Sequence, residues 1–196
     1  MTVVLDYGMG NLRSVQKAVE HLGSECRIQP NLDGATKLII PGVGAFGVAM
    51  ERLRPLAAEI KGYIASGEPL LGVCLGQQVL FQRSEEHGKN EGLGVLNGTV
   101  RYLHRAPGNK VPNVGWCSVN AKAGSKLFEG VQEGSQFYFV HSLYTDCDDL
   151  ADVAAVAPHA VPFPAAIERG RLWATQFHPE KSGAAGLRVL ENFLQC

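Results

Sequence analysis

The first two-thirds of the chain alternates short apolar runs with longer segments in which apolar residues recur every three or four positions. The short runs predict buried strands at residues 2–6, 26–29, 37–40 and 69–73, and the longer segments predict helices at 12–22, 46–65 and 75–82. Pro55 is expected to kink or split the second helix. Because strands that alternate with helices form a parallel sheet covered on both faces, this region predicts an α/β fold.

The pattern changes between residues 93 and 145, where the chain contains the short strand-like pieces TVRYL, KVPNVGW and SQFYFV. These pieces predict an antiparallel excursion or additional strands. Residues 171–177 (RLWATQF) predict a return to the sheet, and residues 186–194 predict a closing amphipathic helix. Without an internal repeat or an obvious linker, residues 1–196 are expected to form one domain.

The charge balance limits the classes of partner. The 196 residues include 18 Lys and Arg against 19 Asp and Glu, so the net charge is -1. Proteins that bind nucleic acid by neutralising phosphates normally carry a basic excess, so no nucleic-acid partner is expected. No apolar run approaches the roughly 20 residues that span a bilayer, and the start of the chain lacks the features of a secretory signal. We therefore expect a soluble, cytoplasmic protein that does not bind membranes.

Five cysteines are present, at positions 26, 74, 117, 147 and 196. Their odd number, their wide spacing and the absence of a C-x-x-C pair argue against a disulfide framework and against a structural zinc site. No metal is expected. Four of them are interpreted as small buried apolar residues or incidental thiols. Cys74 differs because of its neighbours.

Cys74 lies in the segment Gly72-Val73-Cys74-Leu75-Gly76, where an apolar strand is followed directly by a predicted helix. The spacing is that of a nucleophile elbow, a sharp turn that strains the central residue and leaves no room for Cβ atoms at the two glycines. The start of a helix favours a thiolate, and the N–H group of Leu75 becomes available to an oxyanion. A buried cysteine in a glycine-rich turn is the alternative.

A thiolate nucleophile needs a base, and the base needs an orienting group. His178-Pro179-Glu180 follows the apolar strand late in the chain. In an extended segment the imidazole and the carboxylate would point the same way, so His178 is predicted as the base and Glu180 as its orienting group. A solvated loop is the alternative. His141 is interpreted as a structural residue or one near the site.

The segment Pro41-Gly42-Val43-Gly44-Ala45-Phe46-Gly47 contains G-x-G-x-x-G, which is also found in dinucleotide-binding proteins. It follows a later strand than such a site normally uses, and the next strand ends without an acidic residue to hold a ribose. The other interpretation is an oxyanion donor, the N–H group of Val43 or Gly44.

Taken together, GVCLGQQ, FHPEKS and PGVGAF resemble the class I glutamine amidotransferases. Within that class, DYGMGNLRSV, PGVGAFGVAM, YFVHS and TQFHPEKSGAAGLRVLENFL look like the glutaminase subunits of imidazole glycerol phosphate synthases, and the resemblance runs from Asp6 almost to Cys196. It implies the flavodoxin-like fold of that class: a central, mostly parallel sheet flanked by helices, with an antiparallel excursion. It implies no cofactor.

The resemblance makes Cys74 the nucleophile, His178 the general base and acid, and Glu180 the group that orients His178. It assigns the oxyanion hole to the backbone of Val43 and Leu75, with a turn at Val43 that needs a backbone change before the hole is complete. Residues assigned to glutamine binding are Gly42, Gly44, Gln78, His141 and Ser142.

The implied reaction is hydrolysis of L-glutamine to L-glutamate and ammonia through a glutamyl thioester. The implied partner is a (β/α)8-barrel cyclase, which uses the ammonia to make imidazole glycerol phosphate and AICAR from PRFAR in histidine biosynthesis. Expected interface residues are Asn11, Trp116, Tyr138 and Lys181. A glutaminase for a different synthase, a cysteine peptidase or a stress-response protein with a related elbow, and a catalytically silent binding subunit are the alternatives.

Three departures from the family pattern lie outside the triad. The family usually reads His-x-Gly-Trp-Asn where this chain has Asn113 and Cys117 at the two ends of the motif. It usually has Met at the position of Gln77, and it often reads H-S/T-Y where this chain has His141-Ser142-Leu143-Tyr144. These differences are expected to affect the partner contact rather than the chemistry.

Overall fold

The computed structural model describes residues 1–196, and its main element is an eight-stranded mixed sheet in the order β2-β1-β3-β4-β14-β13-β12-β9. Neighbours from β2 to β14 run parallel, whereas β14, β13, β12 and β9 pair antiparallel. The strands are β1 (Thr2–Leu5), β2 (Cys26–Gln29), β3 (Lys37–Gly42), β4 (Leu70–Cys74), β9 (Asn120–Ala121), β12 (Val153–Ala157), β13 (Phe163–Arg169) and β14 (Leu172–Thr175).

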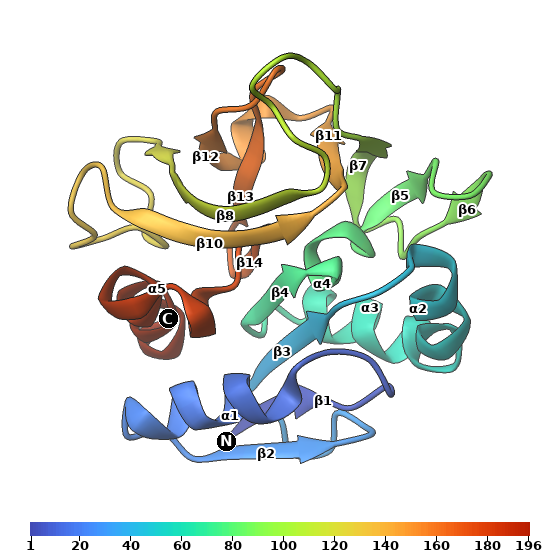
Figure 1. Cartoon of the computed structure of the whole chain (residues 1–196). Coiled ribbons are helices and arrows are strands. Elements are labelled where there is room, and N and C mark those ends of the chain that lie inside the picture. The colour runs from blue at the N-terminus through green and yellow to red at the C-terminus, as the bar shows by residue number, and fades with distance from the viewer.

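Helices cover both faces of this sheet (Figure 1). One face packs against α1 (Leu12–His21) and α5 (Gly183–Gln195), and the other packs against α2 (Phe46–Leu53) and α3 (Ala57–Ala65). Alternate residues of β1 serve the two faces: Val4 packs on the α1 side, and Val3 and Leu5 pack on the α2 side. Strands buried on both faces explain why the predicted runs are apolar without alternation.

The chain between the third and fourth predicted strands behaves as Pro55 suggests. A 3-10 turn, η1 (Arg54–Leu56), separates α2 from α3, so the predicted split of the helix is confirmed. In β3, the strand continues through Pro41 to Gly42 instead of ending at Ile40.

The helix predicted at 75–82 was wrong in length. Helix α4 (Leu75–Gln78) has four residues, and the chain then enters β5 (Phe81–Ser84). The reason is a contact distant in sequence: the N–H group of Leu93 donates to the carbonyl of Val79, and that of Leu96 donates to the carbonyl of Leu80. These later residues take the acceptors that a longer helix would have used.

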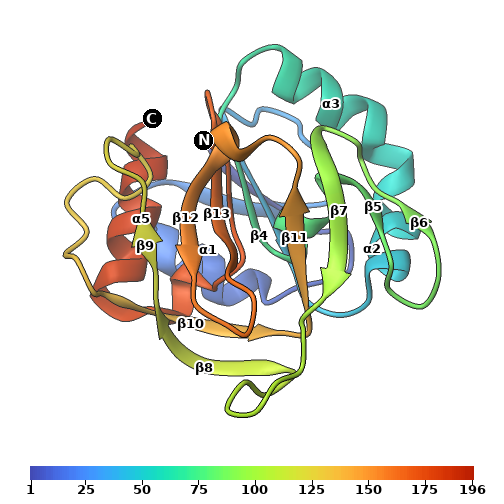
Figure 2. The same ribbon diagram turned by 90° about the horizontal axis from the view of Figure 1, so that it is seen from above.

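Two smaller sheets complete the fold. One has the order β11-β7-β5-β6, and the other pairs β8 with β10 antiparallel. The predicted excursion is confirmed, and its strands are β6 (Asn90–Glu91), β7 (Leu96–Tyr102), β8 (Asn113–Ser118), β10 (Gln136–His141) and β11 (Leu143–Cys147). Figure 2 shows β8 and β10 side by side along one edge of the molecule. Strands β12 and β13, which η2 (Leu150–Asp152) precedes, were not predicted.

None of the helices combines the length and the apolar character that crossing a membrane requires.

Candidate active site

Cys74 is the last residue of β4, and α4 begins at the next position. Its backbone has φ 55° and ψ -106°, in the left-handed half of the φ range that residues other than glycine rarely adopt. A Cβ atom on Gly72 would lie 2.6 Å from the carbonyl oxygen of Gly76, and one on Gly76 would overlap the carbonyl oxygen of Ile40. Both glycines are therefore required by close backbone approaches, as the elbow spacing predicts.

The other half of the site follows β14, where His178 meets Glu180. His178 Nδ1 lies 2.9 Å from Glu180 Oε1, and the two side chains are only 2% and 1% exposed. Because a carboxylate only accepts hydrogen bonds, Nδ1 is the nitrogen that carries the proton in this bond. His178 Nε2 has no hydrogen-bond partner among the protein groups, so it is free to exchange a proton with a reacting group.

The local backbone differs from the expected extended segment. Only His178 is extended, with φ -96° and ψ 97°, and Pro179–Lys181 form a 3-10 turn, η3. Two hydrogen bonds hold this turn: His178 N donates to the carbonyl of Tyr138, and Ser182 Oγ donates to the carbonyl of His178. The histidine is thereby fixed to β10 as well as to β14.

The pKa of His178 is that of an imidazole paired with negatively charged groups. Burial lowers its pKa, but the adjoining Cys74 and Glu180 outweigh burial and raise the pKa to about 9. The protonated imidazole is therefore favoured next to the Cys74 sulfur. By contrast, burial raises the pKa of the Cys26, Cys117 and Cys147 thiols, as expected for cysteines without a catalytic role. All five cysteines are free.

A cavity of about 290 Å³ opens beside Cys74. It brings together seven of the ten residues predicted for catalysis, the oxyanion hole and glutamine binding, although His178 and Glu180 are not part of its lining. The lining consists of Val43, Gly44, Cys74, Leu75, Gln78, Glu86, Pro112, Val140, His141, Ser142 and Leu143. Gly42 lies behind the lining and pairs in register with Cys74. A Cβ atom on Gly42 would lie 2.5 Å from the Tyr7 hydroxyl, so the turn is closely packed from behind.

His141 contacts this cavity as a neutral residue. Its Nδ1 donates to the carbonyl of Leu143 at 2.8 Å, so its Nε2 accepts from Asn113 Nδ2 at 3.0 Å. Burial lowers the pKa of His141 to about 4. Both ring nitrogens are engaged and the ring is hard to protonate, which agrees with a structural role near the site rather than the role of the base.

The family description "Glutamine amidotransferase class-I" matches residues 3–196, nearly the whole chain. The chain belongs to the class I glutamine amidotransferase family. It is 49% identical over 199 residues to "Imidazole glycerol phosphate synthase subunit HisH" of Rhodopirellula baltica, an alignment that covers 98% of this chain and 96% of the relative. It is 45% identical to the HisH subunit of Methanosarcina barkeri, with 98% and 96% covered.

Solved structures share the fold. One described as a glutamine amidotransferase superimposes with a TM-score of 0.77 at 21% identity, covering 99% of this chain and 97% of the other. The structure of PurLQS from Thermotoga maritima gives a TM-score of 0.73 at 22% identity, with 99% and 96% covered. The fold class implied by the sequence is confirmed, and the chain is an amidotransferase subunit of the HisH kind.

In this amidotransferase, Glu86 is a site residue that sequence reasoning missed. Its carboxylate lines the cavity, and its Oε2 accepts a hydrogen bond from the N–H group of Phe46, the first residue of α2. A bound dinucleotide would need that helix start for its phosphate, so the carboxylate occupies the place and the dinucleotide alternative loses its site. The polar stretch SEEHG around Glu86 is typical of a surface loop and gives no signal of this role.

The start of the amidotransferase chain supports the turn at residues 41–44. The Tyr7 hydroxyl donates to the carbonyl of Pro41 at 2.7 Å. A Cβ atom on Gly10 would lie 3.3 Å from Gly42 N, and one on Gly44, whose φ is +110°, would lie 2.9 Å from Met9 Cε. The glycines of the two turns therefore allow the backbones to approach, which explains why the motif DYGMG and the motif PGVG occur together.

Three of the four predicted interface residues form one cluster. The Trp116 and Tyr138 rings meet edge to face with centroids 6.0 Å apart, and Lys181 Nζ lies 5.9 Å from the centre of the Tyr138 ring. Trp116 is 55% exposed, unusual for so large an apolar side chain. Asn11 is separate from this cluster and directly precedes α1, the helix that contacts η3.

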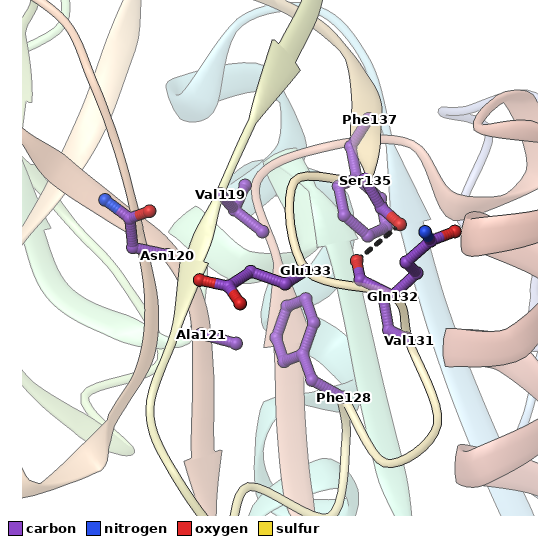
Figure 3. Close-up of a pocket in the computed structure, with 9 residues that line it drawn as sticks. All are labelled: Val119, Asn120, Ala121, Phe128, Val131, Gln132, Glu133, Ser135 and Phe137. Atoms are coloured by element: carbon purple, nitrogen blue, oxygen red, sulfur yellow. Dashed lines mark hydrogen bonds between the residues drawn. The ribbon is translucent and has the colours of Figure 1, made fainter.

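A second cavity of about 300 Å³ lies near the opposite end of β10 (Figure 3). Its apolar part includes Phe128 and Phe137, whose rings meet edge to face, and Glu133 is its one charged residue. It contains no cysteine or histidine. Elsewhere in the chain, no three His, Cys, Asp or Glu side chains come together in an arrangement that could hold a metal ion. The cavity beside Cys74 is therefore the candidate active site.

Proposed function

We propose that Cys74, His178 and Glu180 hydrolyse L-glutamine to L-glutamate and ammonia. The ammonia passes to a (β/α)8-barrel cyclase that makes imidazole glycerol phosphate and AICAR from PRFAR in histidine biosynthesis. The single observation that carries the proposal is the buried, hydrogen-bonded His178–Glu180 pair beside a cysteine in a strained elbow. Residues 1–196 act as one domain, in the cytoplasm.

The first step is attack on the side-chain amide carbon of glutamine by the Cys74 thiolate. Negative charge then develops on the amide oxygen. Leu75 is the first residue of α4, so its N–H group has no partner within the helix and can donate to that oxygen. The N–H group of Val43, on the facing turn, supplies the second donor once the turn adopts the required conformation.

Ammonia leaves in the second step. Protonated His178 gives its Nε2 proton to the departing nitrogen as the C–N bond breaks, and a glutamyl thioester remains on Cys74. Water then attacks the thioester carbon while His178 Nε2 takes its proton, and glutamate is released as the C–S bond breaks. Glu180 holds the Nδ1–H and stabilises the imidazolium in both steps. The chemistry uses side chains, backbone and water, without a cofactor.

Substrate recognition follows from the polar groups of the cavity. Gln78 uses its Nε2 to donate to Leu143 O and to the side-chain oxygen of Gln176, so its own Oε1 is available as an acceptor for the substrate. Glu86 offers a carboxylate to the substrate's ammonium group. Gly42, Gly44, His141 and Ser142 shape the rest of the cavity.

The cluster of Trp116, Tyr138 and Lys181, together with Asn11, supports docking of the partner on this side of the chain. Tyr138 accepts the backbone hydrogen bond of His178, and Lys181 follows Glu180 directly. A cyclase bound there would lie next to the segment that carries the base. This proximity supports a coupling in which glutamine hydrolysis stays slow until the cyclase and its nucleotide substrate bind. Because one oxyanion donor contributes about 10²–10³ in rate, the stimulation should be of that order.

The test is glutamate release from glutamine, measured with the chain alone and then with the cyclase and PRFAR. Cys74→Ser should abolish release, whereas Cys147→Ser, a buried cysteine outside the cavity, should retain it. Full activity in Cys74→Ser would refute the mechanism. Activity that a different ammonia-using synthase stimulates, and the cyclase does not, would keep the mechanism and replace the pathway.

A further inference from the structure

Gln176 is a buried polar residue that the mechanism above does not use. It follows β14, is fully buried, and its backbone N–H group donates to the carbonyl of Ala165 on β13 at 2.9 Å. It does not line the cavity beside Cys74. A fully buried side-chain amide must find partners for its polar atoms, so the partners of Gln176 indicate what it does.

One of those partners is the nucleophile. Gln176 Nε2 donates to Cys74 Sγ at 3.6 Å, and Gln176 Oε1 accepts from Gln78 Nε2 at 3.0 Å. The second bond fixes the orientation of the amide, because a flipped amide would set two NH2 groups against each other. Gln176 therefore has its donor directed at the sulfur and its acceptor directed away from it.

The orientation of Gln78 is fixed in turn. Its Nε2 also donates to the carbonyl of Leu143, at 3.2 Å. The same carbonyl accepts from His141 Nδ1. The amide that contacts the sulfur thus ends a chain of hydrogen bonds in which each donor meets an acceptor, and such chains hold their members in one arrangement.

We infer that Gln176 is a positioning residue for Cys74, whose amide N–H group holds the sulfur and favours its thiolate form. A hydrogen bond to a charged acceptor is stronger than one to a neutral acceptor, so the donor stabilises the thiolate more than the thiol. This inference rests on the proposed role of Cys74 and adds a group that acts on the nucleophile without contacting the substrate.

Among the side chains around Cys74, only Gln176 and His178 are in a state that stabilises the thiolate. His178, from the segment after β14, supplies the positive charge. Tyr7, from the segment after β1, stays neutral because burial and the nearby Cys74 raise its pKa, and His141 on β10 stays neutral because burial lowers its pKa. Glu86, after β5, lines the same cavity. The amide does not titrate, so its effect persists across the pH range.

The test compares Gln176→Met with Gln77→Met in the full chain. Gln77 is a fully buried glutamine on α4, three positions after Cys74, but its Nε2 donates to Thr145 Oγ1 at 2.9 Å and not to the sulfur. The measurement is the rate of alkylation of Cys74 by iodoacetamide as a function of pH, read by mass spectrometry of the peptide that contains Cys74. For Gln176→Met the midpoint should rise by about one pH unit, equivalent to about a tenfold loss of rate near neutral pH, and for Gln77→Met it should not move.

Two further readouts separate positioning from a general effect on folding. In the complex with the cyclase, Gln176→Met should lower kcat for glutamate release and leave KM for glutamine nearly unchanged. In the unmutated chain, the Gln176 side-chain amide resonances should shift on alkylation of Cys74, a measurement that does not depend on any variant folding. A midpoint unchanged from that of the unmutated chain, or amide resonances that do not respond to alkylation, would overturn the inference.

The outcomes also distinguish this inference from the proposed function. If Cys74 of the unmutated chain reacts no faster than the other cysteines at neutral pH, the proposed nucleophile is wrong. If Cys74 is selectively reactive and Gln176→Met retains the same profile, only the role of Gln176 fails.

Discussion

His178 Nδ1 and Glu180 Oε1 are 2.9 Å apart, and the side chains that carry them are almost completely removed from solvent. A carboxylate in such a place needs a partner, and the imidazole is the partner it has, since Glu180 Oε2 bonds to no other protein group. The pair therefore keeps His178 in one tautomer and one orientation. This fixed geometry makes the proposed proton transfers at Nε2 possible.

Replacing Glu180 with Gln should remove the carboxylate charge and keep the packing, because the two side chains have nearly the same shape. The amide lacks the charge that stabilises the imidazolium and can hold the ring in the wrong tautomer, so kcat for glutamate release should fall by about 10³–10⁴. Glu180 is also one of the two groups that raise the pKa of His178 to about 9. The basic limb of the pH–rate profile should therefore move to lower pH in the variant.

The matched control is Glu191→Gln on α5, where the carboxylate pairs with Arg188 at the surface. That variant should retain both the rate and the pH profile. A Glu180→Gln enzyme with the unmutated profile would contradict the assigned role of the pair.

The elements that sequence alone predicted well are those controlled by local pattern. The central parallel strands β1, β3 and β4 are almost entirely apolar because both of their faces are buried, and the elbow depends on glycines that close approaches require. Strand β12 (VAAVA) was missed because alanine occupies three of its five positions, and β13 (FPAAIER) was missed because Pro164 and two alanines interrupt it, so neither shows a clear strand pattern.

The site was predictable where its residues are adjacent in sequence and not where they meet across the fold. Cys74, His178 and Glu180 stand in short motifs. Glu86 enters the cavity through its bond to Phe46, which is 40 positions away in the chain, and Gln176 contacts a cysteine 102 positions away. Contacts of this kind depend on the packing of separate elements, and a single sequence gives no pattern for them.

His141 should make the free energy of unfolding depend on pH below pH 6.5. Burial lowers its pKa from 6.5 to about 4, so between these values the unfolded chain binds a proton that the folded chain excludes. Its neutral form therefore contributes stability that is present above pH 6.5 and is lost as the pH falls towards 4, up to about 3 kcal/mol. In His141→Gln this acid dependence should flatten when the free energy of unfolding is measured between pH 4 and 7.

His104 lies in an exposed loop and provides the control, since His104→Gln should retain the acid dependence. An unchanged slope in His141→Gln would show that another group carries the effect.

Gly76→Ala should destroy the elbow, because the added Cβ atom would overlap the carbonyl oxygen of Ile40, a backbone atom of β3 that cannot move away. We expect loss of glutaminase activity and a loss of about 3 kcal/mol or more in the free energy of unfolding, the range for severe steric conflict in a core. Gly62, within α3, has no neighbouring atom near its Cβ position. Gly62→Ala should therefore be neutral or stabilise by about 0.5–1 kcal/mol, and equal effects at the two positions would contradict the steric argument.

Trp116 should contribute to partner binding without contributing to the fold. It is more than half exposed, its ring contacts Tyr138 at the surface, and Tyr138 in turn accepts the backbone hydrogen bond of His178. Large aromatic residues in such positions often carry a large share of an interface, so Trp116→Ala should weaken binding to the cyclase by about 10–100-fold in a calorimetric titration. The Tm of the free chain should change little.

Leu150, the most exposed of the large apolar residues and located before β12, gives the control, because Leu150→Ala should leave the affinity unchanged. If Leu150→Ala weakens binding and Trp116→Ala does not, the cyclase docks on a different face, and the link between partner binding and the His178 segment is lost.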